Sequence, residues 1–73
     1  MNEVERQKAD YEAITWAWKI LKDHGVPSDD EEYWNALIKT VAEKRNESDI
    51  YNELGIAILN LMEHRLMELR RKE

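Results

Sequence analysis

Apolar residues recur every three or four positions in three segments of the chain, a spacing that places them on one side of an α-helix. This pattern predicts helices over residues 3–23, 29–45 and 49–71. No segment alternates convincingly at the two-residue period of a strand. Because short connections make consecutive helices pack in alternating directions, the sequence predicts an all-α, three-helix up-down-up bundle, with residues 1–73 forming a single helical domain.

The clearest break in the pattern lies at residues 24–28, which contain the only proline and one of the two glycines. Gly25 stands where a left-handed residue commonly ends a helix, and Pro27 prevents the helix from continuing. Ser28 then begins a capping box, in which its hydroxyl accepts from the amide of Glu31 while the Glu31 side chain reaches back. The acidic residues after Ser28 fit the positive end of the second helix.

The second break, at residues 44–49, contains no glycine or proline. It has two residues of types that cap helices, Asn46 and Ser48, and therefore predicts a short turn. A single helix running through this segment is the alternative.

Gly55 lies on the main apolar stripe of the third helix. A mid-helix glycine costs about 1 kcal/mol relative to alanine, so we expect a packing contact that offsets this cost. The missing side chain would let a neighbouring helix or a tryptophan ring approach closely.

The aromatic residues follow the apolar stripes. Aromatic side chains at helical spacing are far more often core residues than the lining of a ligand pocket. The second helix has one apolar arc, formed by Tyr33, Trp34, Leu37, Ile38 and Val41. We therefore expect a core that contains Tyr11, Trp18, Tyr33, Trp34 and Tyr51.

The first helix is apolar on two sides, although a helix with one side exposed to solvent needs only one apolar stripe. One stripe, expected to face the core, consists of Tyr11, Ile14, Ala17, Trp18 and Leu21. The other stripe and a second ridge on the third helix predict a protein interface, because contiguous exposed apolar patches usually mark a contact. Its residues are Ala9, Ala13, Trp16, Ile20, Ile56, Leu59, Leu66 and Met67, with Trp16 as the expected hot spot. The alternative is a wide core-facing arc, which a helix with two neighbours needs.

The length of the chain favours self-association. A chain of 73 residues is near the lower limit for a single hydrophobic core. It contains no cysteine for a disulfide and only two histidines, so a metal staple is also disfavoured. Oligomerisation is the remaining means of stabilising so small a domain, and we expect a homo-oligomer, with a dimer favoured.

The motifs of the common enzyme classes are missing from the sequence. No glutamate is followed three positions later by another glutamate, which excludes the paired magnesium ligands of helical nucleotide pyrophosphohydrolases. Ser28 and Ser48 are explained as caps, and neither Thr15 nor Thr40 has a histidine within one helical turn. His64 is interpreted as a surface residue. We therefore expect a protein that is not an enzyme and that has no cofactor or metal.

Charge and hydropathy restrict the partners. The net charge of −5 has the wrong sign for a protein that binds nucleic acid. No apolar run reaches the roughly 20 residues that span a bilayer, and the charged start lacks the features of a signal peptide. The sequence predicts a cytoplasmic protein that contacts neither nucleic acid nor membrane.

The last two predicted helices resemble those of a group of small helical proteins. The run from Tyr33 to Ile38, the charged break at residues 44–49 and the apolar positions Leu54, Ile58, Leu61 and Met62 resemble small all-helical proteins of bacterial phages and prophages. The resemblance implies a small accessory protein that acts by binding, in some cases against host defence systems. It assigns no functional residues.

Three functional hypotheses follow. The first is a non-enzymatic, self-associating helical module that binds protein. The second is a protein that sequesters a small nucleotide-like ligand at a dimer interface near Trp16 and His64, where Lys19 and Arg70 are the plausible basic groups. The third is an acidic inhibitor of a host nucleic-acid enzyme, with spaced carboxylates at Glu5, Glu12 and Asp23.

Overall fold

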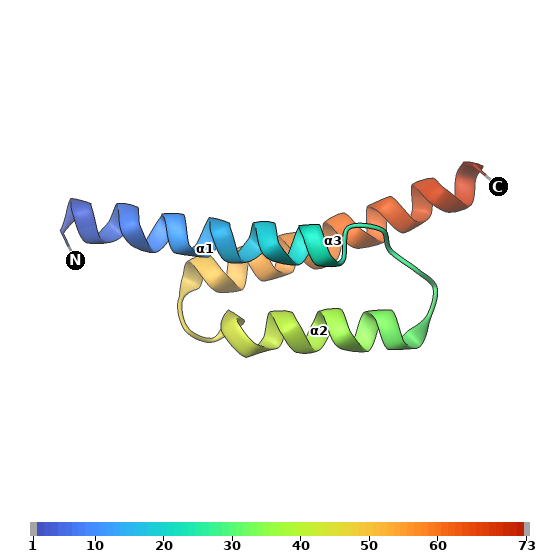
Figure 1. Cartoon of the computed structure of the whole chain (residues 1–73), viewed down its shortest axis with the longest axis horizontal. Helices are drawn as coiled ribbons and strands as arrows, with labels where there is room; N and C mark the ends of the chain where they lie inside the picture. The colour runs from blue at the N-terminus through green and yellow to red at the C-terminus, as the bar shows by residue number, and fades with distance from the viewer. Residues whose placement is uncertain (1, 73) are drawn as a thin grey trace.

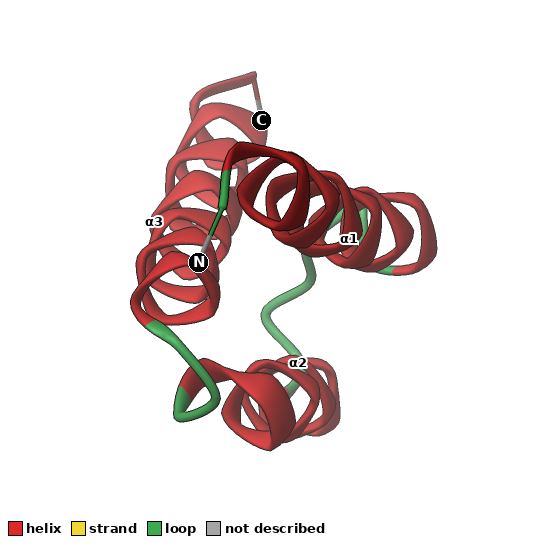
Figure 2. Ribbon diagram, turned by 90° about the vertical axis from the view of Figure 1, so that its left-hand side faces the viewer, coloured by secondary structure: helices red, strands yellow, loops and turns green. Residues whose placement is uncertain are grey.

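The computed structural model of the chain describes residues 2–72. Its helices are α1 (Glu3–Asp23), α2 (Glu31–Arg45) and α3 (Asp49–Lys72), and the described residues contain no strand. Helices α1 and α3 run in the same general direction and α2 runs the opposite way (Figure 1). Seen from the end, the helices occupy the corners of a triangle (Figure 2). The predicted three-helix bundle is confirmed, and a turn separates α2 from α3.

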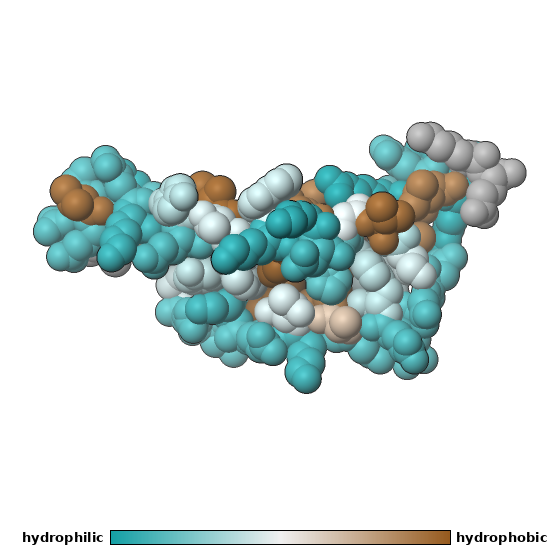
Figure 3. Space-filling model, viewed as in Figure 1, coloured by the Kyte–Doolittle hydropathy of each residue, from teal (hydrophilic) through white to brown (hydrophobic). Residues whose placement is uncertain are grey.

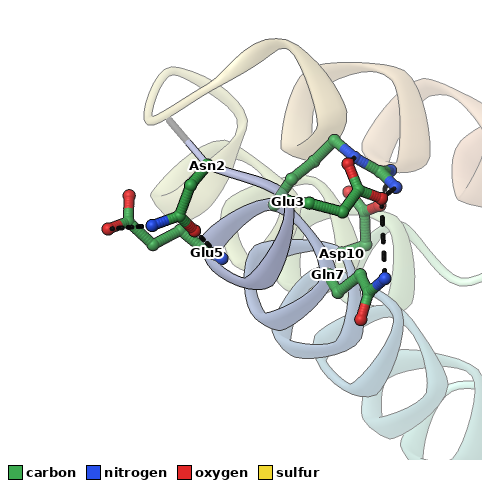
Figure 4. A network of polar contacts seen from close by, with 6 residues as sticks. Asn2, Glu3, Glu5, Gln7 and Asp10 are labelled. Atoms are coloured by element: carbon green, nitrogen blue, oxygen red, sulfur yellow. Dashed lines mark hydrogen bonds and ion pairs between the residues drawn. The ribbon is translucent and has the colours of Figure 1, made fainter.

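Helix α1 begins with a local polar network. The side-chain oxygen of Asn2 accepts a hydrogen bond of 2.8 Å from the amide of Glu5, which is the contact expected of a helix N-cap. Arg6 forms ion pairs with Glu3 and, at 2.9 Å, with Asp10 (Figure 4). These contacts lie within one helix and at its surface, and the first turns of α1 project beyond α2 (Figure 1).

The end of α1 differs from the prediction for Gly25. The amide of His24 donates to the carbonyl of Ile20 at 2.8 Å and ends the helix. No described residue has a positive φ, so the predicted left-handed conformation of Gly25 is wrong. Glycine is favoured here by space instead, because a Cβ atom at this position would lie 2.6 Å from the carbonyl oxygen of Leu21.

The start of α2 also differs from the prediction. The helix begins at Glu31 rather than at residue 29, and Asp30 is its cap, accepting from the amide of Glu32 at 3.1 Å. The Ser28 hydroxyl accepts from the amide of Asp30 at 3.0 Å, so the predicted capping box of Ser28 and Glu31 is wrong. The physical reason is that Ser28 is used in the turn before the helix, while Asp30, an equally good capping residue, stands next to the first helical residue.

Two side chains fasten the connection between α1 and α2 to the rest of the bundle. The hydroxyl of Tyr33 donates to the carbonyl of His24 at 2.7 Å, and the guanidinium of Arg65 donates to the carbonyl of Gly25 at 3.0 Å. Burial raises the pKa of the Tyr33 hydroxyl, an effect that the nearby charge of Arg65 opposes. Pro27, within this connection, is buried. The loop is therefore held by both α2 and α3.

The core is formed where the three helices meet. Its buried residues are Ala17, Ile20, Leu37, Val41, Ile58 and Met62. The prediction that Gly55 permits a close approach is confirmed, because a Cβ atom there would lie 2.7 Å from Cγ1 of Val41 and 3.8 Å from Cη2 of Trp16.

One residue of the expected core on α2 lies at the surface. Ile38 is half exposed, although Tyr33 and Trp34 on the same predicted arc pack against the core. Helix α2 packs mainly against α3 and has few contacts with α1. The side of α2 that carries Ile38 therefore lacks a covering helix.

Candidate functional site

The stripe of α1 that was expected to face the core is divided: Ala17 is buried and Leu21 packs against the core, whereas Tyr11, Ile14 and Trp18 are exposed. On the other stripe, Ala13 and Ile20 are buried, and Trp16 packs against the core. These residues therefore cannot form an exposed interface, and their assignment to one is wrong.

Residue size explains this arrangement. Ala13 and Ala17 present small side chains toward the bundle, and Gly55 on α3 presents none. Small residues let two helices approach closely. The ring of Trp16 reaches across this contact and meets Tyr51 edge to face, with ring centroids 5.2 Å apart and an interplanar angle of 74°. The stripe of Ala13, Trp16 and Ala17 therefore fits α3, whereas bulkier residues at the alanine positions would hold the helices apart.

The predicted ridge on α3 is divided between the core and the surface. Leu59 packs against the core, and Leu66 is partly buried. Ile56 and Met67 are exposed, and Ala9 on α1 is partly exposed. Because its central residues on α1 are buried, the predicted surface joining both ridges does not exist as one exposed patch.

The exposed apolar stripe of α1 is the most distinctive surface feature. We call Val4, Tyr11, Ile14 and Trp18 the α1 seam; their exposed fractions are 75%, 73%, 59% and 61%. Val4, Tyr11 and Trp18 are spaced by seven residues, and Ile14 lies three positions after Tyr11. These are the a and d positions of a heptad repeat, the pattern of helices that pair along their length. Apolar and pale side chains lie among hydrophilic ones along this edge of the molecule (Figure 3).

Sequence reasoning missed Val4 as part of this stripe. Its spacing of seven residues from Tyr11 was the available signal. The structure adds that no helix covers it, because Val4 lies in the part of α1 that projects beyond α2 (Figure 1).

A shallow groove of about 380 Å³ lies beside the seam, where α1 meets the last turn of α2 and the first turn of α3. Its lining includes Tyr11, Trp16, Lys19, Lys44 and Tyr51. The ammonium of Lys44 lies 5.6 Å from the centre of the Tyr51 ring, within the range of a cation–π interaction. The groove is an open depression that combines aromatic surface with two cations.

The residues expected to hold a small ligand are not brought together. Trp16 lies near Gly55, whereas His64 is exposed more than two helical turns further along α3. Arg70 forms an ion pair with Asp29, so only Lys19 of the two expected basic groups lies in the groove beside Trp16. The ligand site as predicted, at Trp16 and His64 together, is therefore not formed within this chain.

Helix α1 does not have a face that carries acidic residues alone. Glu5, Glu12 and Asp23 are exposed as expected, but Lys19 and Lys22 are exposed on the same helix. Among the residues that the structure describes, no three His, Cys, Asp or Glu side chains gather in a way that would hold a metal ion.

No protein-family model, curated protein or solved structure matches the chain. Across residues 2–72, none of the helices combines the length and apolar character needed to cross a membrane. Inference about function therefore depends on the side chains that the fold leaves exposed.

Proposed function

We propose that this protein is a non-enzymatic helical module that self-associates, and that two copies pair through the α1 seam. The observation that carries the proposal is the alignment of four large apolar side chains on one helix, each more than half exposed. Single exposed apolar residues are common on protein surfaces. Several exposed apolar residues aligned at heptad spacing are instead typical of a helix that packs against another helix.

The area of the seam is sufficient for a small interface. Because an aromatic side chain carries about 150–250 Å² of surface, Tyr11 and Trp18 expose roughly 300 Å² per copy, and Val4 and Ile14 add to it. Pairing two seams would remove on the order of 1,000 Å² from water, which is close to the lower limit for a specific protein interface. We therefore expect a reversible dimer.

The projecting start of α1 supports the same proposal. Residues 2–8 are exposed, and the structure shows only local contacts there, among them the Asn2 cap and the Arg6 ion pairs. Isolated short helices are marginal in water, and exposed ion pairs add little to stability. A second copy along the seam would supply the apolar packing that α1 lacks at this end.

Sedimentation velocity across micromolar to millimolar protein tests the proposal. Trp18→Glu should weaken dimerisation by at least about 100-fold, because tryptophan is enriched among the hot spots of protein interfaces and Trp18 is one of the two aromatic residues of the seam. Val26→Glu is the matched control, since it places the same charge on an exposed apolar residue in the loop between α1 and α2, outside the seam. Circular dichroism should show that both variants retain helix.

Two results would contradict the proposal. One is a wild-type protein that remains monomeric over the whole concentration range. The other is a Trp18→Glu variant that dimerises as strongly as Val26→Glu.

A further inference from the structure

We infer that the two copies pair with their α1 helices parallel and in register, so that each seam residue meets its own counterpart. This inference rests on the proposed self-association and names the partner surface, which is the same stripe of a second copy. It follows mainly from residues that flank or interrupt the seam, and the position of the seam residue Val4 supports it.

The charges on the two flanks of the seam differ in sign. The e positions of the heptad on one flank are Lys8, Thr15 and Lys22, and the g positions on the other are Glu3, Asp10 and Ala17. In a parallel pair, each g flank faces the partner's e flank, which places Glu3 opposite Lys8 of the second copy. In the fully aligned antiparallel pair, like flanks meet and Lys8 lies opposite Thr15 of the second copy, so the contact between Glu3 and Lys8 is lost. Electrostatic complementarity therefore favours the parallel arrangement.

The ion pairs of Arg6 do not remove this asymmetry. Arg6 contacts Glu3 and Asp10 from within the same helix. Both carboxylate oxygens of Glu3, the residue opposite Lys8 of the second copy, already accept from Arg6, but a carboxylate oxygen accepts more than one hydrogen bond. The acidic flank can therefore accept from a lysine of the second copy while Arg6 remains bound.

Gln7 provides the second argument, because it is the polar residue at a d position within the seam. Its amide makes a single long contact, 3.5 Å from Glu3, and is otherwise exposed. In a parallel pair, Gln7 meets Gln7 of the second copy, and each amide can both donate and accept. In the antiparallel register that aligns the two seams fully, Gln7 faces Trp18, and its polar atoms lose water without gaining an equivalent partner.

The exposure of Val4 supports the same orientation. Val4 lies in the projecting start of α1 (Figure 1). Parallel pairing places the two projecting turns against each other and covers both valines. Antiparallel pairing places Val4 beside Leu21, which already packs against its own core and has less surface to share.

Because the chain contains no cysteine, disulfide formation by Gln7→Cys can report the orientation. This substitution leaves all four seam residues in place. In the parallel pair, the two introduced thiols face each other, whereas in the fully aligned antiparallel pair they are separated by eleven residues of helix, about 16 Å. Ala42→Cys, at an exposed position on α2, is the control for random collision.

Under a glutathione redox buffer, Gln7→Cys should form the covalent dimer at least about 100-fold faster than Ala42→Cys, because the thiols have a high effective concentration. Sedimentation of the reduced variant separates the two proposals. If the Gln7→Cys variant dimerises when reduced but does not form the disulfide in the redox buffer, the parallel orientation is wrong and the proposed self-association still holds. A monomeric wild-type protein would overturn the proposed function itself.

A charge exchange decides the orientation if Gln7→Cys prevents dimerisation. Glu3→Lys and Lys8→Glu should each weaken self-association, because each places like charges opposite each other in the parallel pair. Mixing the two variants should restore association, because each contact between position 3 of one copy and position 8 of the other then joins a lysine to a glutamate. Mixed samples that associate no better than the separate variants would contradict parallel pairing.

Discussion

Replacing Gly55 with alanine should destabilise the protein, although alanine is the better helix former. Gly55 is buried in α3, and an added Cβ atom would lie 2.7 Å from Cγ1 of Val41. Val41 is only 1% exposed, and its β-branched side chain is stiff within a helix. The Val41 methyl group therefore cannot turn away, and the two helices must separate slightly to accommodate the new atom.

The magnitude follows from two opposing effects. Glycine to alanine within a helix stabilises by about 1 kcal/mol. Inserting a methyl group into a packed core costs about 1–3 kcal/mol, and the approach of 2.7 Å to Val41 points to the upper part of that range. The net destabilisation should be about 1–2 kcal/mol, which lowers Tm by roughly 4–8 °C for each kcal/mol in a domain of this size.

Urea and thermal denaturation, followed by circular dichroism at several protein concentrations, would measure this change. Ala57→Gly is the matched control, because Ala57 is exposed in the same helix and reports helix propensity alone, about 1 kcal/mol. Combining Gly55→Ala with Val41→Ala should cost less than the sum of the two single changes, by about 1 kcal/mol or more. A Gly55→Ala variant that is more stable than wild type, or strict additivity with Val41→Ala, would refute the proposed contact.

Two further predictions concern the connection between α1 and α2. Asp30→Ala should lower the free energy of unfolding by about 1 kcal/mol in urea denaturation, and Ser28→Ala by less, because Asp30 is the cap of α2. Wild-type protein should lose stability at alkaline pH, and Tyr33→Phe should abolish this loss. Burial raises the pKa of the Tyr33 hydroxyl in the folded protein. The contribution of this hydroxyl to stability is therefore complete below the unfolded pKa of about 10 and is lost as pH rises through the folded pKa. Denaturation of wild type and variant on both sides of that pH would check this.

Most of the fold could be predicted from local signals in the sequence. The three periodic segments and the breaks between them located each helix to within two residues at its ends. The position of Gly55 on an apolar stripe correctly indicated a close contact. The misassigned cap at Asp30 depends on competition among neighbouring capping groups, which a sequence pattern ranks poorly because several residue types cap equally well. The conformation of Gly25 depends on its distance from the Leu21 carbonyl, which the sequence does not show.

The orientation of α1 could not be obtained in the same way. Both of its stripes contain a tryptophan, an isoleucine and at least one alanine, so periodicity along a single helix does not distinguish them. The outcome depends on the partner helix, where Gly55 and Tyr51 both lie against Trp16. Complementarity of size between two helices is a property of the pair, and larger apolar residues such as Tyr11 and Trp18 are left outside.

This division separates the contacts that fold the chain from those proposed to join two chains. Ala13 and Ile20 stabilise the bundle from within, whereas Tyr11 and Trp18 contribute little to the packing of the isolated chain. A charged residue at Trp18 should therefore change the sedimentation of the protein while leaving the stability of the monomer nearly unchanged. A bulky residue at Ala13 should do the reverse and disrupt the fold itself, because Ala13 has no exposed surface into which a larger side chain can extend.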